Sequence, residues 1–157
     1  MADKKLDIYV GCSLTQAPQE FVDSVESLKD TLKQSYDVFD FLGLVDGTER
    51  DVYDWDIKHC VGQAALLLAV CDYPSIGLGY EMATAIEKQG TPTLAVAHED
   101  TKVTRLILGV DAPNYRFRRY QSLDQVAEFV DEEIERHGLV VAETVIPTDL
   151  STFQQPA

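Results

Sequence analysis

The stretch AALLLAVCDYPSIGLGYEMATAIEKQGTPTLAVA, residues 64–97, decides the fold. Its first seven residues are apolar throughout and too few for a helix, which is typical of a strand buried on both faces of a parallel sheet. A loop with two glycines leads into a helical stretch, expected over about residues 80–88 and ending at Gly90. Because a second apolar strand follows over residues 91–97, the stretch predicts a strand, a helix and a parallel strand in succession.

The same alternation continues on the N-terminal side. Residues 6–10 and 36–41 have the composition of strands, and the helix between them is indicated by four apolar residues at helical spacing, Phe21, Val25, Leu28 and Leu32. A second helix follows, with one apolar face that we expect to pack on the core, made of Tyr53, Ile57, Val61 and Ala64.

On the C-terminal side we expect a short helix over residues 102–108, an edge strand over residues 115–118 and an amphipathic helix ending at Gly138. The chain therefore predicts one α/β doubly wound domain, flavodoxin-like or Rossmann-like, with a parallel sheet of about five strands. We place this domain at residues 1–138. Residues 139–157 lack a clear period and are interpreted as a C-terminal tail that can pack on a neighbouring subunit.

Composition excludes several classes of protein. The formal net charge of -14, without a locally basic run, disfavours binding to nucleic acid. No apolar run approaches the roughly 20 residues that span a bilayer, and the N-terminus lacks the pattern of a signal peptide, so the sequence predicts a cytoplasmic protein without membrane contact. The three cysteines, Cys12, Cys60 and Cys71, are expected to be buried free thiols rather than disulfides or zinc ligands.

The chemistry is expected at the carboxyl ends of the strands, where ligands bind in open parallel sheets. There Gly77 and Gly79 allow close approach of a ligand to the backbone, and Ser75 precedes the helix. Taken by themselves, these three residues are better explained as a plain helix cap and turn. Glu81 is placed in the first turn of the helix, where the helix dipole would keep its carboxylate ionised as a nucleophile or an electrostatic stabiliser.

A second pair of carboxylates lies in the segment YDWD, residues 53–56. Asp54 and Asp56 are two residues apart on a helix, so they face different directions and only one can point into a common site. Asp56 lies beside the apolar face, whereas Asp54 lies nearly opposite to it. A solvated acidic face is the simpler interpretation, but two carboxylates across a sugar-sized gap are also what cleavage of a glycosidic bond requires.

These segments resemble the nucleoside 2-deoxyribosyltransferases and the related 2'-deoxynucleoside 5'-phosphate N-hydrolases. The likeness covers about residues 6–138. It rests on DIYVGCSL (7–14), on the helix that carries the Asp and Trp residues, and on PSIGLGYEMATAI (74–86) followed by GTPTLAVA (90–97). The most specific element is PS-x-G-x-GYE.

The resemblance implies a role for each matching residue. Glu81 falls on the catalytic nucleophile, which forms a covalent glycosyl intermediate, and Tyr9 falls on a tyrosine that lines the site and positions this glutamate. Asp56 is the best match to the aspartate that handles protons at the base, although Asp54 stays open. Ser75 and Gly77 match the loop at the 5' end of the sugar.

The first loop departs from the N-hydrolase pattern G-S-I-R. This chain reads CSLT, so Ser13 is retained and Thr15 replaces the arginine near the phosphate. Thr104 aligns with a serine that the neighbouring subunit contributes in the N-hydrolases, which implies a homodimer or higher homo-oligomer. Because Thr15 stands in place of that arginine, transfer of deoxyribose between free nucleosides is somewhat favoured over use of a 5'-phosphate, and water stays open as the acceptor.

The leading hypothesis is an enzyme that cleaves the N-glycosidic bond of 2'-deoxynucleosides or their 5'-monophosphates through a glycosyl-Glu81 intermediate. The expected partner is a small nucleoside or nucleotide, and the resemblance implies neither a metal nor another cofactor. Two alternatives have the same fold. One is a non-catalytic nucleotide-binding or sensing module, and the other is a flavodoxin-like or response-regulator-like signalling domain.

Overall fold

Five parallel strands form the centre of the molecule. The computed structural model describes residues 3–41 and 47–141. Within them the elements are β1 (Asp7–Cys12), α1 (Gln19–Leu32), β2 (Asp37–Phe39), α2 (Glu49–Tyr53), the π-helix η1 (Asp54–Val61), β3 (Leu66–Val70), α3 (Ile76–Ala83), the π-helix η2 (Thr84–Gln89), β4 (Thr93–His98), α4 (Arg105–Leu108), β5 (Tyr115–Tyr120) and α5 (Asp124–Arg136). The strand order β2-β1-β3-β4-β5 is that of a flavodoxin-like doubly wound sheet, so the predicted fold class is confirmed.

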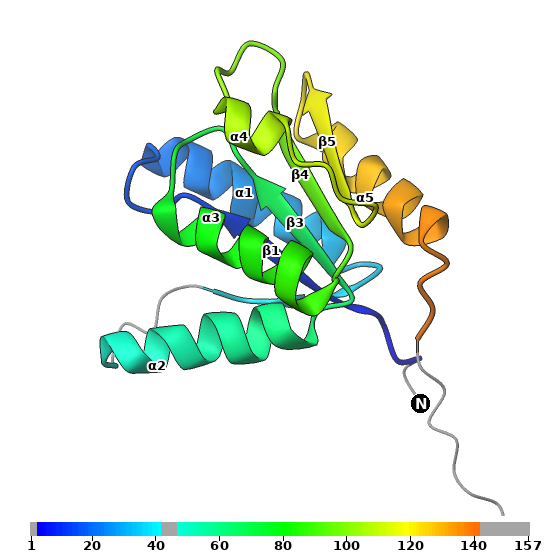
Figure 1. Cartoon of the computed structure of the whole chain (residues 1–157). Coiled ribbons are helices and arrows are strands. Elements are labelled where there is room, and N and C mark those ends of the chain that lie inside the picture. The colour runs from blue at the N-terminus through cyan, green and yellow to red at the C-terminus, as the bar shows by residue number, and fades with distance from the viewer. Residues whose placement is uncertain (1–2, 42–46, 142–157) are drawn as a thin grey trace, which may run out of the picture.

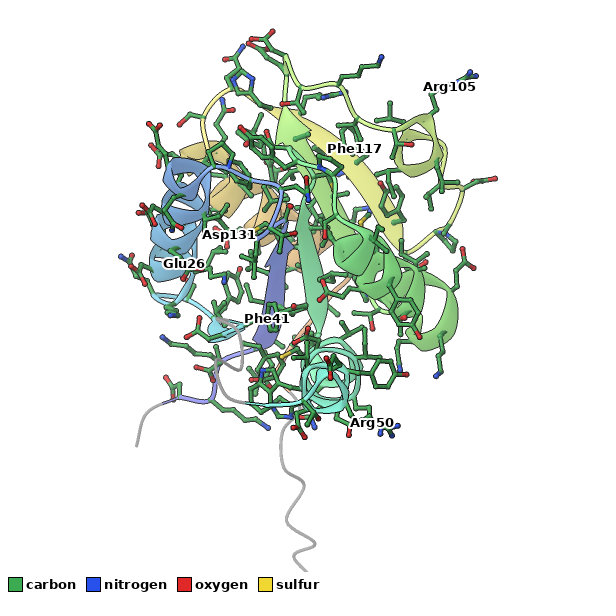
Figure 2. All side chains as sticks on the ribbon, turned by 90° about the vertical axis from the view of Figure 1, so that its left-hand side faces the viewer. Glu26, Phe41, Arg50, Arg105, Phe117 and Asp131 are labelled. Carbon is green, nitrogen blue, oxygen red and sulfur yellow. The ribbon has the colours of Figure 1, made fainter. Side chains whose placement is uncertain are left out.

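Helices cover both faces of the sheet (Figure 1). On one face α1 and α5 pack on the apolar side chains of the central strands, and on the other face η1, α3 and η2 do so. The side view separates these layers: Glu26 of α1 and Asp131 of α5 lie on one side of the sheet, and Arg105 of α4 lies on the other (Figure 2). Because helices cover both faces, every residue of β3 is buried, which explains why its sequence is a continuous apolar run.

A row of small residues crosses the face of the sheet on which α3 packs. Gly11 of β1 pairs in register with Ala69 of β3, and Ala69 pairs with Ala95 of β4. Gly11 lies against the side chains of Leu78 and Glu81. The small row therefore leaves room for α3 to bring these two side chains close to the end of β1.

The helix after β3 begins earlier than predicted. It was expected from residue 80, but α3 begins at Ile76, and Ser75 caps it by accepting a hydrogen bond from the Leu78 N–H at 3.1 Å. The start of the helix was not predicted because Gly77 and Gly79 lie in its first turn, and glycine is a weak helix former. The predicted end was right, since Gly90 closes the helical run with a left-handed φ of 68°.

Tyr53 does not pack in the core as predicted. It is 37% exposed, and its ring meets the ring of Tyr80 edge-on with centroids 6.3 Å apart. The prediction assumed an α-helical period, whereas the chain continues from α2 into the π-helix η1, whose wider turn forms i→i+5 hydrogen bonds and shifts the residues that face the sheet. Ile57 and Val61 of η1 are buried as expected.

The last helix ends near the predicted position. After α5, Gly138 adopts a left-handed φ of 59°, and the Leu139 N–H donates to the Ile134 carbonyl at 3.0 Å. The predicted tail over residues 139–157 lies almost entirely outside the described residues. The domain boundary at Gly138 and the packing of the tail on another subunit therefore stay predictions.

Candidate active site

Glu81 reaches from α3 to the end of β1. Its Oε1 accepts a buried hydrogen bond of 2.9 Å from the Tyr9 hydroxyl, which is the contact that the resemblance implied. Its Oε2 lies beside Gly11, so closely that a Cβ at position 11 would come within 2.9 Å of it. Tyr9 and Gly11 are two residues apart on β1 and therefore face the same side of the sheet, so together they form a cradle for one carboxylate.

The electrostatic environment of Glu81 differs from the predicted one. Because α3 begins at Ile76, Glu81 lies in the second turn, beyond the reach of the helix dipole, which acts mainly within the first turn. The side chain is only 8% exposed, and burial is the main reason why its pKa rises from 4.5 to about 7. The hydrogen bond from Tyr9 lowers this pKa and the charge of Asp56 raises it further. The expectation that the dipole keeps Glu81 ionised was therefore wrong.

Asp56 provides the second carboxyl group, on η1. It is 8% exposed, and burial raises its pKa from 3.8 to about 6. Its Oδ1 is buried without a hydrogen-bond partner among the described residues. A buried carboxyl oxygen without a hydrogen-bond partner destabilises the folded protein, and a bound ligand that donated the missing hydrogen bond would remove this destabilisation.

Asp54 lies in a different environment from Asp56, as the helical geometry predicted. Its half-exposed carboxylate forms ion pairs with Lys58 at 2.6 Å and with Arg50 at 3.1 Å. The hydrogen bond from Lys58 is the main reason why the pKa of Asp54 is lowered. Asp54 is thus ionised at neutral pH and already paired.

The loop residues line two pockets on either side of Ser75. One pocket, of about 370 Å³, lies between the first loop and the start of α3 and is lined by Thr15, Gln16, Pro74, Ser75, Ile76 and Gly77. The other, of about 360 Å³, lies between α3 and the segment before α4, and its lining includes Ser75, Gly79, Lys102 and Thr104. The predicted binding residues Ser75, Gly77, Gly79 and Thr104 therefore all border a cavity.

Ser13 is fully buried and is not among the residues that line these two pockets. Its Oγ accepts a hydrogen bond of 3.3 Å from the Gln16 N–H, so it shapes the loop that carries Thr15 and Gln16. The residue is part of a turn in this structure, and a direct contact with a ligand stays a prediction.

Sequence reasoning missed two residues at this edge of the sheet. Gly11 was not singled out, although its position two residues after Tyr9 on a strand could have indicated a shared face. Asp72 follows β3, and its Oδ1 accepts hydrogen bonds from the His98 N–H at 2.9 Å and the Thr101 hydroxyl at 3.2 Å. Asp72 thereby fixes the loop after β4, and its Oδ2 is buried without a partner among the described residues.

Cys60 belongs to the same buried cluster as Tyr9, and the charges of Asp56 and Glu81 add to the rise of its pKa. The three cysteines are free; Cys60 is buried as predicted, whereas Cys12 and Cys71 are partly exposed. Burial raises the pKa of Cys60 and of Cys71 to about 12, so neither is a thiolate at neutral pH. Over residues 3–41 and 47–141, no group of three or more His, Cys, Asp or Glu side chains could hold a metal ion. None of the helices in the described part is long and apolar enough to cross a membrane.

Fold and site together define a doubly wound α/β protein with two buried carboxyl groups of raised pKa, Asp56 and Glu81, near the edge where such sheets bind ligands. No protein-family model matches the chain. Two curated proteins are similar, both named "Putative 2'-deoxynucleoside 5'-phosphate N-hydrolase 1". The one from Thermofilum pendens is 33% identical over 86 residues, which cover 54% of this chain and 59% of that protein. The one from Methanococcoides burtonii is 36% identical over 62 residues, 40% of this chain and 49% of that protein.

The matched segments thus span about half the length of the curated relatives. They confirm the resemblance to the nucleoside 2-deoxyribosyltransferases and their N-hydrolase relatives.

Among solved structures, Clostridium botulinum CMP N-glycosidase BcmB aligns with a TM-score of 0.59 at 18% identity, over 80% of this chain and 98% of that chain. Francisella novicida lysine decarboxylase LdcF aligns with a TM-score of 0.53 at 12% identity, over 87% of this chain and 18% of that chain. These two structures support the fold alone.

Proposed function

We propose that this protein is an enzyme that cleaves the N-glycosidic bond of 2'-deoxynucleoside 5'-monophosphates or 2'-deoxynucleosides. The observation that carries the proposal is the pairing of Glu81, held by Tyr9, with the second buried carboxyl of Asp56. The names of the curated relatives favour a 5'-monophosphate as substrate and water as acceptor.

The reaction proceeds in two displacements. A carboxylate oxygen of Glu81 attacks the anomeric carbon, the bond from this carbon to the base nitrogen breaks, and its electron pair stays on the nitrogen, which takes a proton from Asp56. Water then attacks the same carbon, gives a proton back to Asp56 and releases Glu81. The configuration at the anomeric carbon is retained, and the transition states have oxocarbenium character that the ionised carboxylate stabilises.

The free enzyme must shift one proton before it can react in this way. Burial raises both pKa values, to about 6 for Asp56 and about 7 for Glu81, so between pH 6 and pH 7 the pair carries about one proton, more often on Glu81 than on Asp56. The reaction requires the other singly protonated form, with the proton on Asp56 and with Glu81 ionised. Tyr9 favours this form, because its hydroxyl donates to Glu81 and stabilises the ionised carboxylate.

The 5' end of the substrate would lie in the pocket lined by Thr15, Gln16, Ser75 and Gly77. Glu81 does not itself line this pocket, but Gly77 precedes Glu81 by about one helical turn on α3, which supports a position of the sugar between the pocket and the carboxylate. Among the described residues that line it there is no lysine or arginine. This supports a second candidate function, the transfer of deoxyribose between bases with free nucleosides as substrates.

A substrate panel tests the proposal. The protein is incubated with 2'-deoxynucleosides and their 5'-monophosphates, each with and without a second base, and the free and exchanged bases are separated by chromatography. We expect release of free base that Glu81→Gln abolishes. If neither base release nor base exchange is detected with any member of the panel, the enzyme proposal fails and the non-catalytic binding module takes its place.

A further inference from the structure

The two oxygens of Glu81 have different surroundings. Oε1 is held by the Tyr9 hydroxyl at 2.9 Å. Oε2 accepts no hydrogen bond from the described residues. In this part of the chain the fully buried side-chain atoms without a partner are Asp56 Oδ1 and Asp72 Oδ2, and Oε2 is not one of them. Oε2 therefore keeps some contact with solvent. Oε2 is therefore the oxygen that is free to form a new bond.

Gly11 is the residue against which Oε2 lies. A Cβ at position 11 would come within 2.9 Å of Glu81 Oε2 and 2.8 Å of Leu78 Cδ1, which is closer than such contacts occur in proteins. The backbone itself does not require glycine, since the glycines with positive φ in the described residues are Gly90 and Gly138. Position 11 requires a residue without a side chain, because the carboxylate of Glu81 lies where a Cβ would be in contact with it.

We propose that Gly11 is a positioning residue that fixes the carboxylate of Glu81 so that Oε2, and not Oε1, attacks the substrate. This inference rests on the proposed function. The bond from Oε2 to the anomeric carbon forms as the bond to the base nitrogen breaks, the electron pair leaves with the base, and Tyr9 keeps its hydrogen bond to Oε1 throughout.

A methyl group at position 11 should act on the carboxylate more than on the fold. Both atoms that it would meet are the far ends of flexible side chains, which can move by a rotamer adjustment without displacing the sheet. The displacement of the carboxylate, in contrast, affects the reacting atoms directly, and a misplacement of about 1 Å at a reacting group costs on the order of 10²-fold in rate.

The test compares the wild type with Gly11→Ala and with a control on the same strand. Val10→Ile also adds one methyl to β1, but into the core on the opposite face of the sheet. Release of base is measured over a range of substrate concentrations, which gives both the rate at saturation and KM, with melting temperature as the measure of folding. We expect Gly11→Ala to fold, to lose at least about tenfold in rate with little change in KM, and Val10→Ile to keep the wild-type rate.

Two further measurements separate this proposal from simpler explanations. Leu78→Val in the Gly11→Ala background removes the contact with Leu78 Cδ1; if this restores the rate, crowding of Leu78 explains the loss and the proposal is overturned. Carbon-13 NMR titration of the Glu81 carboxyl group needs no activity, and we expect a higher midpoint in Gly11→Ala, because a displaced carboxylate loses the Tyr9 hydrogen bond.

The outcomes are distinguishable from those that test the proposed function. A wild type that releases no base from any deoxynucleotide removes the proposed function, whereas a shifted titration midpoint in Gly11→Ala still supports the positioning of the carboxylate. A folded Gly11→Ala variant with the wild-type rate and the wild-type midpoint overturns the role of Gly11.

Discussion

Replacing Glu81 by Gln should make the protein more stable at alkaline pH. In the wild type, Glu81 is buried with a pKa of about 7, compared with an ordinary value of 4.5. The folded state therefore binds more protons than the unfolded state between these two values, so the stability of the wild type falls as pH rises through this window and is constant above it. Gln keeps the shape of the side chain and an oxygen that can accept the Tyr9 hydrogen bond, but it cannot ionise.

The magnitude follows from the pKa shift. A shift of one pKa unit corresponds to 1.36 kcal/mol, so the difference between 4.5 and about 7 amounts to at most about 3 kcal/mol in favour of Glu81→Gln at pH 8. At pH 4, below the unfolded pKa, both states of the wild type carry the proton and the two proteins should be equally stable. Burial raises the pKa because an ionised carboxylate is less well solvated inside the protein than in water, and this lowers the free energy of unfolding of the wild type above pH 7.

Denaturant unfolding at pH 4 to pH 8 measures this difference. A matched control is Glu87→Gln, which changes an exposed carboxyl group further along the same helical run and should alter the free energy of unfolding by no more than about 0.5 kcal/mol at any pH. If Glu81→Gln and the wild type differ by the same amount at pH 4 and pH 8, the carboxyl group is not buried as described. A wild type that gains stability relative to Glu81→Gln as pH rises would refute the reasoning outright.

The remaining predictions concern activity and assembly. Asp56→Asn should slow the release of bases that are poor leaving groups by about 10²–10⁴-fold, the loss expected when acid catalysis is removed, whereas Asp54→Asn should have little effect; the reverse result would exchange their roles. The rate should have a bell-shaped pH dependence, falling below about 6 as both carboxyl groups become protonated and above about 7 as the pair loses its shared proton, and a flat profile between pH 5 and pH 8 would contradict it. The resemblance implies that Thr104 acts on a neighbouring subunit, so light scattering should show a dimer or a larger assembly, and a fully active monomer would exclude a shared site.

The sheet could be predicted from the sequence because a strand that is buried on both faces consists almost entirely of apolar residues. The runs that became β3 and β4 are apolar at nearly every position, and Gly90 marks the end of the helix between them. The start of that helix could not be predicted, since Gly77 and Gly79 weaken the helical pattern over its first turn. The π-helix η1 was missed for a different reason: its i→i+5 hydrogen bonds correspond to no residue type.

Some contacts between the candidate residues could be predicted from the sequence, but their electrostatics could not. The different directions of Asp54 and Asp56 follow from helical geometry alone, and the sequence resemblance indicated the contact between Tyr9 and Glu81. The raised pKa of Glu81 depends on its burial in the folded protein, where it contacts Tyr9 of β1, 72 residues away in the sequence. The space at Gly11 is likewise a property of the packed sheet and helix.

Trapping of the intermediate tests the central claim most directly. A deoxynucleoside or deoxynucleotide analogue whose glycosyl intermediate is hydrolysed slowly, such as a 2-fluoro sugar, is incubated with the protein, and the protein is examined intact and after digestion by mass spectrometry. We predict the addition of one glycosyl unit, located on Glu81 and absent from Glu81→Gln. A protein that releases base from its substrates while the sugar is found on another residue, or on none, would contradict the role of Glu81 as the nucleophile.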